Sequence, residues 1–496
     1  MNSSGLNHID RIPGVTRLCL RFSLITSVCL FTIGMAPIFS EELRDTRRLY
    51  LQFCASCHGA EMDGGNGGSL LTGVMKHGTS DEAIARVIAD GLPDEGMPGY
   101  SQQLSSDEIL AMVGLIKATA MLPVDTRMSL SDKIFGDGVL HSGKHRFRIE
   151  TVLDAPDVIW GMAYLPDGSL LYTMRSGQLM HWDGRGEAHE IQGTPGVWAV
   201  GQGGLLAVTV HPDSVSNGWI YLGFSEHIGV FEEGRPAGMT TVVRGRIDNG
   251  RWVDQELIYR APKDTHTSPH HHFGTRIVVR DGYLFFGVGD RGRMDQAQDL
   301  SSPAGKIHRL HEDGRIPEDN PFQGDGALRS VWSIGHRNPQ GMVFDPENGD
   351  LWTAEHGPRG GDELNLVRKG LNYGWPLVTH GINYDETPIT EKTSMPGMED
   401  PLLQWTPSIA VCGITFYSGD AFPDWKGCLF ACGLVSEQLH RIQVHEGVVI
   451  LDEIVLKGHG RIRDVVTGPD GMLYIALYRE RPRQAWIKRL VPVPDA

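Results

Sequence analysis

Two cysteines followed at once by a histidine form the clearest chemical motif in the chain, Cys54-Ala55-Ser56-Cys57-His58. At this spacing two thiols add to the vinyl groups of a haem, and the adjacent imidazole ligates the iron. A redox-active or zinc-binding Cys-x-x-Cys pair is the alternative. The immediate histidine favours haem, so the motif predicts one covalent haem c, attached through Cys54 and Cys57 and ligated by His58.

The second axial ligand of a haem that carries electrons is expected to be a methionine thioether. The candidates in this part of the chain are Met62, Met75, Met97 and Met112. Met97 lies in an irregular Gly-Met-Pro-Gly loop before the last predicted helix, and a loop can place a side chain over the haem. Met112 fits the core of that helix better. We therefore expect Met97 to ligate the iron.

Polar side chains also gather beside glycines at five places after residue 200. The segments are 201–206, 270–276, 335–341, 355–363 together with 372–376, and 460–464. Each is ambiguous by itself. The three histidines of 270–272 are compatible with a metal site. Gly357 and Pro358 with Glu363 are compatible with a calcium loop, because hard cations take carbonyl and carboxylate oxygens.

Arg461 and Arg463 alternate along a predicted strand and therefore share one face of it. Two like charges on one face of an acidic protein predict an anionic ligand, because the forked guanidinium group suits a carboxylate. A pair of surface salt bridges is the alternative that these residues leave open.

Three helices are predicted to position the haem motif, over residues 41–53, 80–90 and 105–121. The third begins with a capping box, in which Ser105 and Glu108 satisfy each other's backbone N–H groups. Gly91 and Pro123 are stop signals behind the second and third helices. Residues 123–146 have no clear period and are predicted to be a linker. This organisation, with a Met-Pro loop before the final helix, resembles a small class I cytochrome c over residues 41–122.

A repeat after residue 147 predicts the architecture of the rest of the chain. Six segments share a turn glycine followed by an apolar, aromatic-rich strand: 168–172, 218–221, 282–286, 349–352, 427–430 and 471–474. A four-stranded propeller blade takes about 40 to 50 residues, and longer intervals absorb loop insertions. The expected fold is mainly β, a six-bladed β-propeller over 147–496 preceded by a small all-α cytochrome c domain. A β-sandwich with coincidental turns is the alternative.

The N-terminus is predicted to be a secretory signal over residues 1–40. Arg17 and Arg21 precede the apolar stretch 22–35, and small and polar residues follow it. An uncleaved membrane anchor is the alternative, although the stretch is shorter than the about 20 residues that span a bilayer. We therefore expect a periplasmic protein, associated with the membrane only if the signal is retained. The formal net charge of -16 argues against nucleic acid as a partner.

Three of the seven cysteines lie in the predicted propeller: Cys412, Cys428 and Cys432. An oxidising compartment would permit one disulfide among them and leave one thiol over. Cys412 and Cys432 fall on what the pattern predicts to be neighbouring strands of a hairpin. Their pairing is the hypothesis that this placement favours.

The five polar segments, taken in order, resemble the soluble six-bladed PQQ-dependent aldose sugar dehydrogenases of the glucose/sorbosone dehydrogenase family. The resemblance covers about residues 147–490. It implies that His272 is the catalytic base, which takes a proton from the anomeric hydroxyl while hydride passes to the quinone. It also implies that Asp290 orients that base.

The resemblance further implies a set of residues that contact the cofactor through its quinone edge, its ring or its carboxylates. These residues are Gln202, Arg337, Asn338, Tyr384, Ser408, Arg461 and Arg463. A calcium ion at the PQQ would use the backbone oxygens of Gly357 and Pro358. A second, structural calcium would use Glu363 and the backbone oxygen of Tyr373.

The chain departs from the family at two points. Some members supply a lysine to a PQQ carboxylate from the stretch that here reads 432–436, and no lysine is present there. Cys412 replaces a small residue close to the cofactor loop. The first change removes a positive charge from the predicted pocket, and the remaining arginines are expected to hold the cofactor.

The combined expectation is a quinohaemoprotein dehydrogenase. An aldose is oxidised at C1 to its lactone, and the electrons pass through PQQ and haem c to an external cytochrome or oxidase. One alternative keeps the fold and changes the substrate to another alcohol, a sugar alcohol or L-sorbosone. Another alternative is a non-enzymatic propeller that binds a ligand, with the haem as a sensor.

Overall fold

The computed structural model describes residues 46–54, 58, 62, 69–71, 76–92, 97–120, 138–142, 145–445, 447–480 and 483–494. The predicted signal segment, Cys57 and Met75 lie outside these described residues. None of the helices in the described ranges has the length and hydrophobicity needed to span a bilayer.

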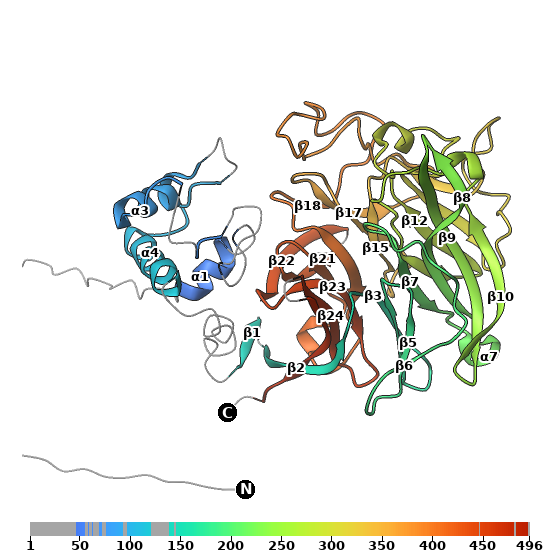
Figure 1. The fold of residues 1–496 in the computed structure, drawn as a ribbon, viewed down its shortest axis with the longest axis horizontal. Coiled ribbons are helices and arrows are strands. Elements are labelled where there is room, and N and C mark those ends of the chain that lie inside the picture. Colours follow the sequence, from blue (N-terminus) through green and yellow to red (C-terminus); the bar gives the residue numbers. More distant parts are fainter. Residues whose placement is uncertain are drawn as a thin grey trace, which may run out of the picture. The chain divides into compact units, whose positions relative to one another are not determined.

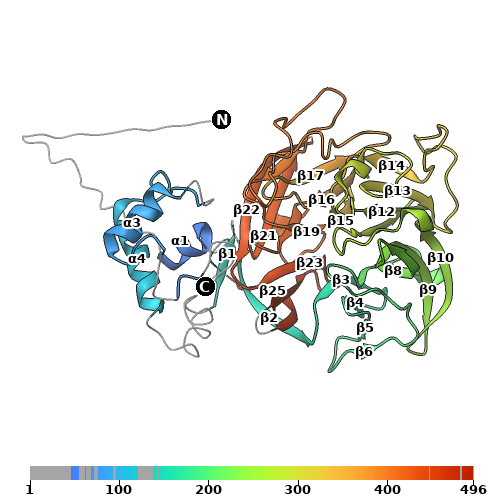
Figure 2. The same cartoon turned by 45° about the horizontal axis from the view of Figure 1, so that its top comes forward.

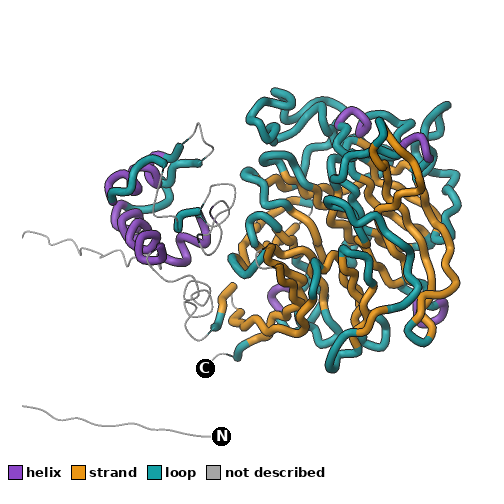
Figure 3. Tube along the Cα trace, viewed as in Figure 1, coloured by secondary structure: helices purple, strands orange, loops and turns teal. Residues whose placement is uncertain are grey.

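The N-terminal domain contains the three predicted helices, α1 (Thr46–Phe53), α3 (Asp81–Asp90) and α4 (Ser106–Ala120). They are drawn in blue tones in Figure 1 and in purple in Figure 3. Apolar side chains at helical spacing pack α1, α3 and α4 into one core, with Tyr50, Ile84, Ile88, Met112 and Ile116 among its buried members. These residues form a single small core between the three helices.

The predicted start signals of α3 and α4 and the stop signal at Gly91 are confirmed, whereas Pro123 lies outside the described residues. Ser80 caps α3 by accepting a hydrogen bond from the Ala83 N–H, and Gly91 follows the helix with a φ of 75°. Before α4, the Ser105 N–H donates to Glu108 Oε2 at 2.9 Å, and the Glu108 N–H donates to Ser105 Oγ at 3.3 Å. This reciprocal pair is the predicted capping box.

Ser105→Ala is expected to destabilise the N-terminal domain by about 1 kcal/mol, because the Glu108 N–H loses its acceptor at the start of α4. The measurement is urea unfolding of the full chain followed through the haem Soret band. Ser106→Ala is the matched control in the first turn of the same helix. Equal midpoints for the two variants would contradict the prediction.

Six antiparallel sheets make up the rest of the chain, and Figure 2 shows them arranged around a common axis. Five of them each use four consecutive strands.

The first sheet contains β3 (Ile159–Tyr164), β4 (Leu170–Met174), β5 (Leu179–Trp182) and β6 (His189–Glu190). The second contains β7 (Leu205–Val210), β8 (Ile220–Glu232), β9 (Arg235–Asp248) and β10 (Arg251–Arg260). The third contains β11 (Ile277–Arg280), β12 (Tyr283–Val288), β13 (Lys306–His311) and β14 (Val331–Ile334). The fourth contains β15 (Pro339–Phe344), β16 (Leu351–Glu355), β17 (Asp362–Val367) and β18 (Leu403–Trp405). The fifth contains β19 (Val411–Phe416), β20 (Leu429–Gly433), β21 (Gln438–His445) and β22 (Val448–Lys457).

The sixth sheet joins the two ends of the propeller. It contains β23 (Arg461–Thr467), β24 (Leu473–Glu480), β25 (Arg483–Pro492), β2 (His145–Ala155) and β1 (Leu140–Ser142) in that order. The pairing of β2 with β25 closes the ring. The propeller therefore begins at Leu140, and the predicted boundary at 147 was placed too late. Only β1, with 3 residues, and the first two residues of β2 precede position 147, too few to give a period that separates them from a linker.

The repeated glycines are the turns between the first and second strands of all six sheets. Gly168, Gly218, Gly282, Gly349, Gly427 and Gly471 all have positive φ angles, from 69° to 87°. Only glycine adopts this region readily, which explains the repeat. The first strands of neighbouring sheets contact one another around the ring. Because a hairpin reverses the chain, the start of each first strand lies at the end of the propeller opposite its glycine turn.

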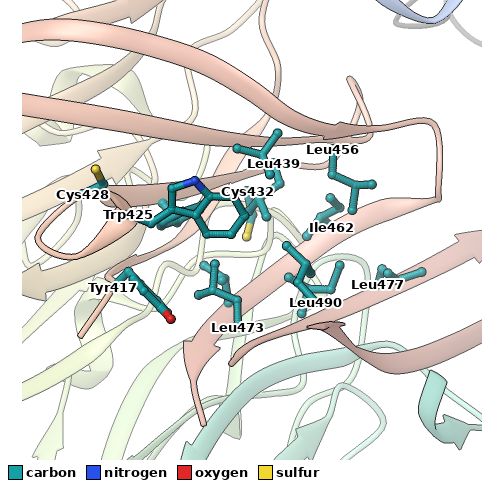
Figure 4. Close-up of a cluster of buried hydrophobic side chains, with 14 of the residues drawn as sticks. Tyr417, Trp425, Cys428, Cys432, Leu439, Leu456, Ile462, Leu473, Leu477 and Leu490 are labelled. Atoms are coloured by element: carbon teal, nitrogen blue, oxygen red, sulfur yellow. The ribbon is translucent and has the colours of Figure 1, made fainter. Parts of the chain in front are cut away.

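The largest apolar cluster joins the fifth and sixth sheets, and Figure 4 shows it. Leucines of β21, β24 and β25, among them Leu439, Leu473 and Leu490, pack with Trp425 and Cys432. The strands from the two ends of the domain are thus held by a shared core as well as by their hydrogen bonds.

The predicted disulfide between Cys412 and Cys432 is wrong. The two residues do lie on adjacent strands, β19 and β20, but both are free and buried. The register shifts between Val411 and Ile414, so the expected cross-strand pairing is interrupted at Cys412. Its Sγ instead contacts the backbone oxygens of Ile462 at 3.2 Å and Cys432 at 3.5 Å.

Candidate functional site

The predicted base and its orienting carboxylate are in direct contact. His272 Nδ1 lies 2.6 Å from Asp290 Oδ1, and His272 comes from the loop before β11. Asp290 also accepts hydrogen bonds from the Gly292 N–H at 2.7 Å and from Trp375 Nε1 at 2.8 Å. Burial alone would raise the pKa of Asp290, but the hydrogen bond from His272 and the charge of Arg337 hold that pKa below its usual value.

The protonation pattern of the pair follows from these contacts. An ionised Asp290 only accepts hydrogen bonds, so Nδ1 of His272 carries the proton. Nε2 then has a free lone pair. Burial, aided by the positive charge of Arg337, lowers the pKa of His272 to about 4, while Asp290 acts in the opposite direction. His272 is therefore a neutral imidazole at pH 7 that can accept a proton at Nε2.

We expect the acid limb of kcat/KM for sugar oxidation to lie well below pH 6.5, toward pH 4. Activity that needs neutral His272 is present above the folded-state pKa and is lost as the pH falls through it. The measurement is a pH profile of kcat/KM between pH 3.5 and 8, which reports the pKa values of groups in the free enzyme. An acid limb at the ordinary histidine value would show that the imidazole is not desolvated as described.

Gln202 fixes the backbone beside the base. Its side-chain oxygen accepts a hydrogen bond from the His272 N–H at 2.9 Å, and its own N–H donates to the His270 carbonyl at 2.8 Å. This places the loop before β7 against the loop before β11. The predicted contact of Gln202 with a quinone stays a prediction.

Arg337 and Asn338 stand directly before β15, next to the base. Arg337 Nη1 donates to the carbonyl oxygens of His356 at 3.0 Å and Gly357 at 2.6 Å. Asn338 Oδ1 accepts from the Gly274 N–H at 3.2 Å. The opposite edges of both side chains are unused: Arg337 Nε and Asn338 Nδ2 are buried and have no partner among the described residues.

The arginines of β23 lie near the same site. A register shift between Ile462 and Asp464 interrupts the alternation of the strand at Arg463. Arg463 is buried with its guanidinium carbon 4.4 Å from the Trp160 ring centroid, and burial lowers its pKa. Arg461 donates to the Tyr478 hydroxyl at 3.0 Å. The surface salt-bridge alternative thus fails for Arg463, which has no ion pair within the described part of the chain, but it holds for Arg461, whose Nε lies 3.6 Å from Glu480 Oε1.

A neighbouring arginine is already neutralised. Arg276 makes two contacts to the Asp464 carboxylate, at 3.1 and 3.0 Å, and this pair joins the loop before β11 to β23 across the ring. Asp464 also accepts from the Met162 N–H at 2.8 Å. Asp464 therefore compensates Arg276, and the charge of Arg463 stays available for an anion.

His356 is a site residue that the sequence reasoning did not assign. Burial and the positive charges of Arg463 and Arg337 hold its pKa well below the usual value, with His272 and Arg461 contributing further. Its Nε2 is buried without a partner in the described ranges. His356 thus lies close enough to the predicted base and to the arginines of β23 and of the loop before β15 for their charges to act on its pKa. The only sequence signal was its place in the polar segment 355–363.

Ser408 and Tyr384 differ in their positions. Ser408 Oγ donates to Asp362 Oδ1 at 2.7 Å, and Asp362 also accepts from the Gly357 N–H at 2.8 Å and the Val411 N–H at 2.9 Å. Ser408 thus supports the loop that carries Gly357. Tyr384 is 75% exposed, and no described contact joins it to this cluster. Its predicted cofactor contact stays a prediction.

The residues predicted to hold a structural calcium lie on two paired strands. Glu363 of β17 faces Glu355 of β16 across the pair. Burial, with the nearby charge of Glu355, raises the pKa of Glu363 to about 8. Tyr373 stacks on His336 with ring centroids 4.7 Å apart. No group of three or more His, Cys, Asp or Glu side chains with metal-site spacing occurs in the described ranges.

The haem motif is described in part. Cys54 is buried at the end of α1, and the His58 N–H donates to the Cys54 carbonyl at 3.0 Å. Met97 pairs with Leu92 through two backbone hydrogen bonds of 2.8 and 3.1 Å, in the loop between α3 and α4. Met112 is fully buried in the helical core, as expected. Met62 is also fully buried, so it remains a second candidate, beside Met97, for the sixth ligand of the haem iron.

Known proteins resemble both parts of the chain. Residues 153–483 match the family described as Glucose / Sorbosone dehydrogenase, and residues 41–116 match Cytochrome C oxidase, cbb3-type, subunit III. The aldose sugar dehydrogenase YliI of Escherichia coli K12 is 43% identical over 66% of this chain and 89% of its own length. Cytochrome c55X of Paracoccus denitrificans is 32% identical over 18% of this chain and 84% of its own length.

Solved structures show the same relationship. The apo-form of the soluble aldose sugar dehydrogenase from Escherichia coli covers 70% of this chain and 100% of its own, with a TM-score of 0.66 and 39% identity. The PQQ-bound aldose sugar dehydrogenase from Streptomyces coelicolor covers the same shares, with a TM-score of 0.57 and 26% identity. The chain therefore belongs to the glucose/sorbosone dehydrogenase family, as a six-bladed β-propeller that carries an N-terminal cytochrome c domain.

Proposed function

We propose that the protein is a quinohaemoprotein dehydrogenase, which oxidises aldose sugars at C1 to lactones with PQQ and passes the electrons to haem c. The contact between His272 and Asp290, placed beside buried arginines, carries this proposal. A neutral imidazole with a fixed tautomer is the group that proton removal from a sugar hydroxyl requires. The relatives named as aldose sugar dehydrogenases support the substrate class.

The residues around His272 fit a planar, polyanionic cofactor. Arg463 is buried without a carboxylate partner, and Arg337 Nε and Asn338 Nδ2 are buried without acceptors in the described part of the chain. A buried donor without a partner is costly, so a ligand that supplies acceptors would stabilise this arrangement. PQQ, a tricarboxylate quinone, supplies those acceptors and takes up the hydride when bound. The PQQ-bound relative supports this choice.

The protein's own residues would act on the proton of the substrate. His272 Nε2 accepts the proton of the anomeric hydroxyl as the C1 hydrogen leaves as hydride, so the sugar loses two electrons and two hydrogens. Asp290 stabilises the imidazolium that forms and keeps the Nδ1 proton in place. Hydrogen bonds from Trp375 and Gly292 fix the orientation of the Asp290 carboxylate toward His272.

Calcium is proposed at two places, on different grounds. Glu355 and Glu363 face each other on paired strands, and burial together with the negative charge of Glu355 raises the pKa of Glu363, which supports a cation beside the pair. Tyr373 would add its backbone oxygen there. At the cofactor, the oxygens of Gly357 and Pro358 are the proposed ligands. Gly357 O already accepts from Arg337, so its second lone pair would face the ion.

The haem would accept the electrons from the reduced cofactor and pass them to an external acceptor. A quinol carries two electrons and a haem carries one at a time, which is a reason to join both in one chain. Attachment through Cys54 and Cys57, with His58 and Met97 as axial ligands, is proposed for a protein exported to the periplasm by the segment 1–40. An external cytochrome or oxidase would receive the electrons.

The test is anaerobic reduction of the haem by sugar. Purified full-length protein, loaded with PQQ and calcium, is mixed with a panel of aldoses, and the α-band of reduced haem is recorded. The proposal expects reduction that depends on both sugar and PQQ, with lactone as the product. A haem that stays oxidised across the panel would overturn it.

A further inference from the structure

Arg291 directly follows the carboxylate that orients the predicted base, and it is fully buried. All hydrogen bonds of its guanidinium group go to backbone carbonyl oxygens. Burial lowers its pKa to about 9, so the group is still charged at pH 7. Its Nε is buried and has no partner within the described part of the chain. The hydrogen bonds that Nη1 and Nη2 form all go to the backbone, an arrangement that holds a loop shape without needing a substrate or cofactor.

Two of the three carbonyls that Arg291 holds lie in the loop that carries His272, and the third lies in β9. Its Nη2 donates to the Pro269 oxygen at 2.5 Å and to the Gly238 oxygen of β9 at 3.3 Å, and its Nη1 donates to the His271 oxygen. The guanidinium carbon also lies 3.5 Å from the centroid of the Phe273 ring. Arg291 therefore contacts the residue before His272 and the residue after it.

The backbone at the base needs such support. His272 and Arg291 both have a φ of 55°, in the left-handed region that non-glycine residues rarely adopt. A conformation of this kind persists only where the surrounding contacts over-determine it. Gln202 and Asp290 hold His272 itself, and Arg291 holds both of its neighbours. The left-handed turn aims the imidazole at Asp290, so a relaxed loop would move Nε2 from the site.

We propose that Arg291 is a positioning residue, which holds the backbone before His272 by hydrogen bonds and the Phe273 ring after it by stacking, so that the imidazole stays on Asp290 with Nε2 facing the substrate. Its consequence for catalysis rests on the proposed function, whereas its effect on the loop does not. The clamp needs the planar fork of arginine. A lysine keeps the charge but cannot reach three carbonyls and stack on Phe273 at once.

The experiment uses the full chain with Arg291→Lys and Arg291→Met. Arg280 provides the matched control, because it also donates to a backbone oxygen, of Asp345, and lies over a Phe344 ring, but at the glycine-turn end of the same sheet. Hydrogen exchange of the peptide 266–276 is followed by mass spectrometry in the cofactor-free protein. The kcat and KM values for sugar are then measured after loading with PQQ and calcium.

Both Arg291 variants are expected to exchange faster in 266–276, with peptides of β19–β22 unchanged. We also expect kcat to fall about 10- to 100-fold in Arg291→Lys, because a displaced catalytic group loses its near-attack geometry, with KM changed less than kcat. Arg280→Met should match the wild type in both measurements. If Arg291→Met does not fold, Arg291→Lys decides.

Wild-type exchange in 266–276 for Arg291→Lys would overturn the clamp. So would faster exchange accompanied by unchanged kcat. Because the exchange measurement needs neither sugar nor cofactor, it stands even if the protein proves not to oxidise aldoses. Failure of the proposed function would instead appear as inactivity of the wild type.

Discussion

Replacing His272 by Ala is expected to lower kcat for aldose oxidation by about 10²- to 10⁴-fold, which is the usual contribution of a positioned acid–base group. Asp290 would lose the imidazole that it orients, and no other neutral base with a free lone pair contacts that carboxylate in the described part of the chain. Haem incorporation should be unaffected, because Cys54 and His58 belong to the helical domain. The measurements are steady-state kinetics with PQQ and calcium present, and the haem content of the purified protein.

Two companion variants sharpen this result. His272→Gln keeps an amide donor for the buried Asp290 carboxylate and should therefore fold even if the alanine variant does not. His270→Ala removes an exposed imidazole that packs edge-on against Trp198, with ring centroids 5.2 Å apart. If the three histidines formed a metal site, His270→Ala would lower activity as well. Activity near the wild-type value in His272→Gln would contradict the role of the base.

The propeller was predictable because its turns are local. A glycine with positive φ and the strand after it recur in each sheet, and neither depends on distant residues. The ring closure was not predictable in the same way. Strand β2 obtains its second partner, β25, from the other end of the chain, and β1 pairs only with β2, so the short segment around 140–146 carries little signal of its own. The capping box before α4 was predictable for the same local reason as the turns.

In the candidate site, too, features set by local sequence were predictable and features set by distant contacts were not. His272, Asp290 and the arginines stand in recognisable segments, and the structure brings them together. Trp375 and His356 were missed as partners because their roles depend on contacts between loops that lie far apart in sequence, such as the 2.8 Å hydrogen bond from Trp375 to Asp290. Position alone also could not show that Asp464 neutralises Arg276 while Arg463 stays unpaired.

The absence of the family lysine from 432–436 acquires a physical meaning from this arrangement. The backbone there is part of β20 and the turn that follows it, and the nearby thiols of Cys412 and Cys432 are buried and neutral. Burial raises the pKa of Cys412 to about 11, so it supplies no charge that could compete with an anion. The attraction for the cofactor carboxylates would then rest on Arg461, Arg463 and Arg337.

The double variant Cys54→Ser/Cys57→Ser, which removes both haem attachment points, is expected to keep sugar oxidation and to lose electron transfer to an external cytochrome. Sugar oxidation with an artificial two-electron acceptor dye should continue, because His272 and the arginines belong to the propeller. Reduction of an added soluble cytochrome should fall to background, because a quinol then has no one-electron relay within the chain. The two acceptors are compared on the same preparation, with PQQ and calcium present.

A variant that keeps the haem attached makes this comparison decisive, since the N-terminal domain of the double variant is at risk of misfolding. Met97→Ala should retain the covalent haem and its His58 ligand. It should change the absorption bands of the oxidised haem, because the iron loses an axial ligand, and it should lower the reduction potential, which a thioether ligand raises. Slower cytochrome reduction with unchanged dye activity is expected. Unaltered spectra would assign the sixth ligand to another residue, with buried Met62 as the next candidate. Dye and cytochrome activities that fall together in both variants would show that the haem serves the propeller's stability and does not carry its electrons.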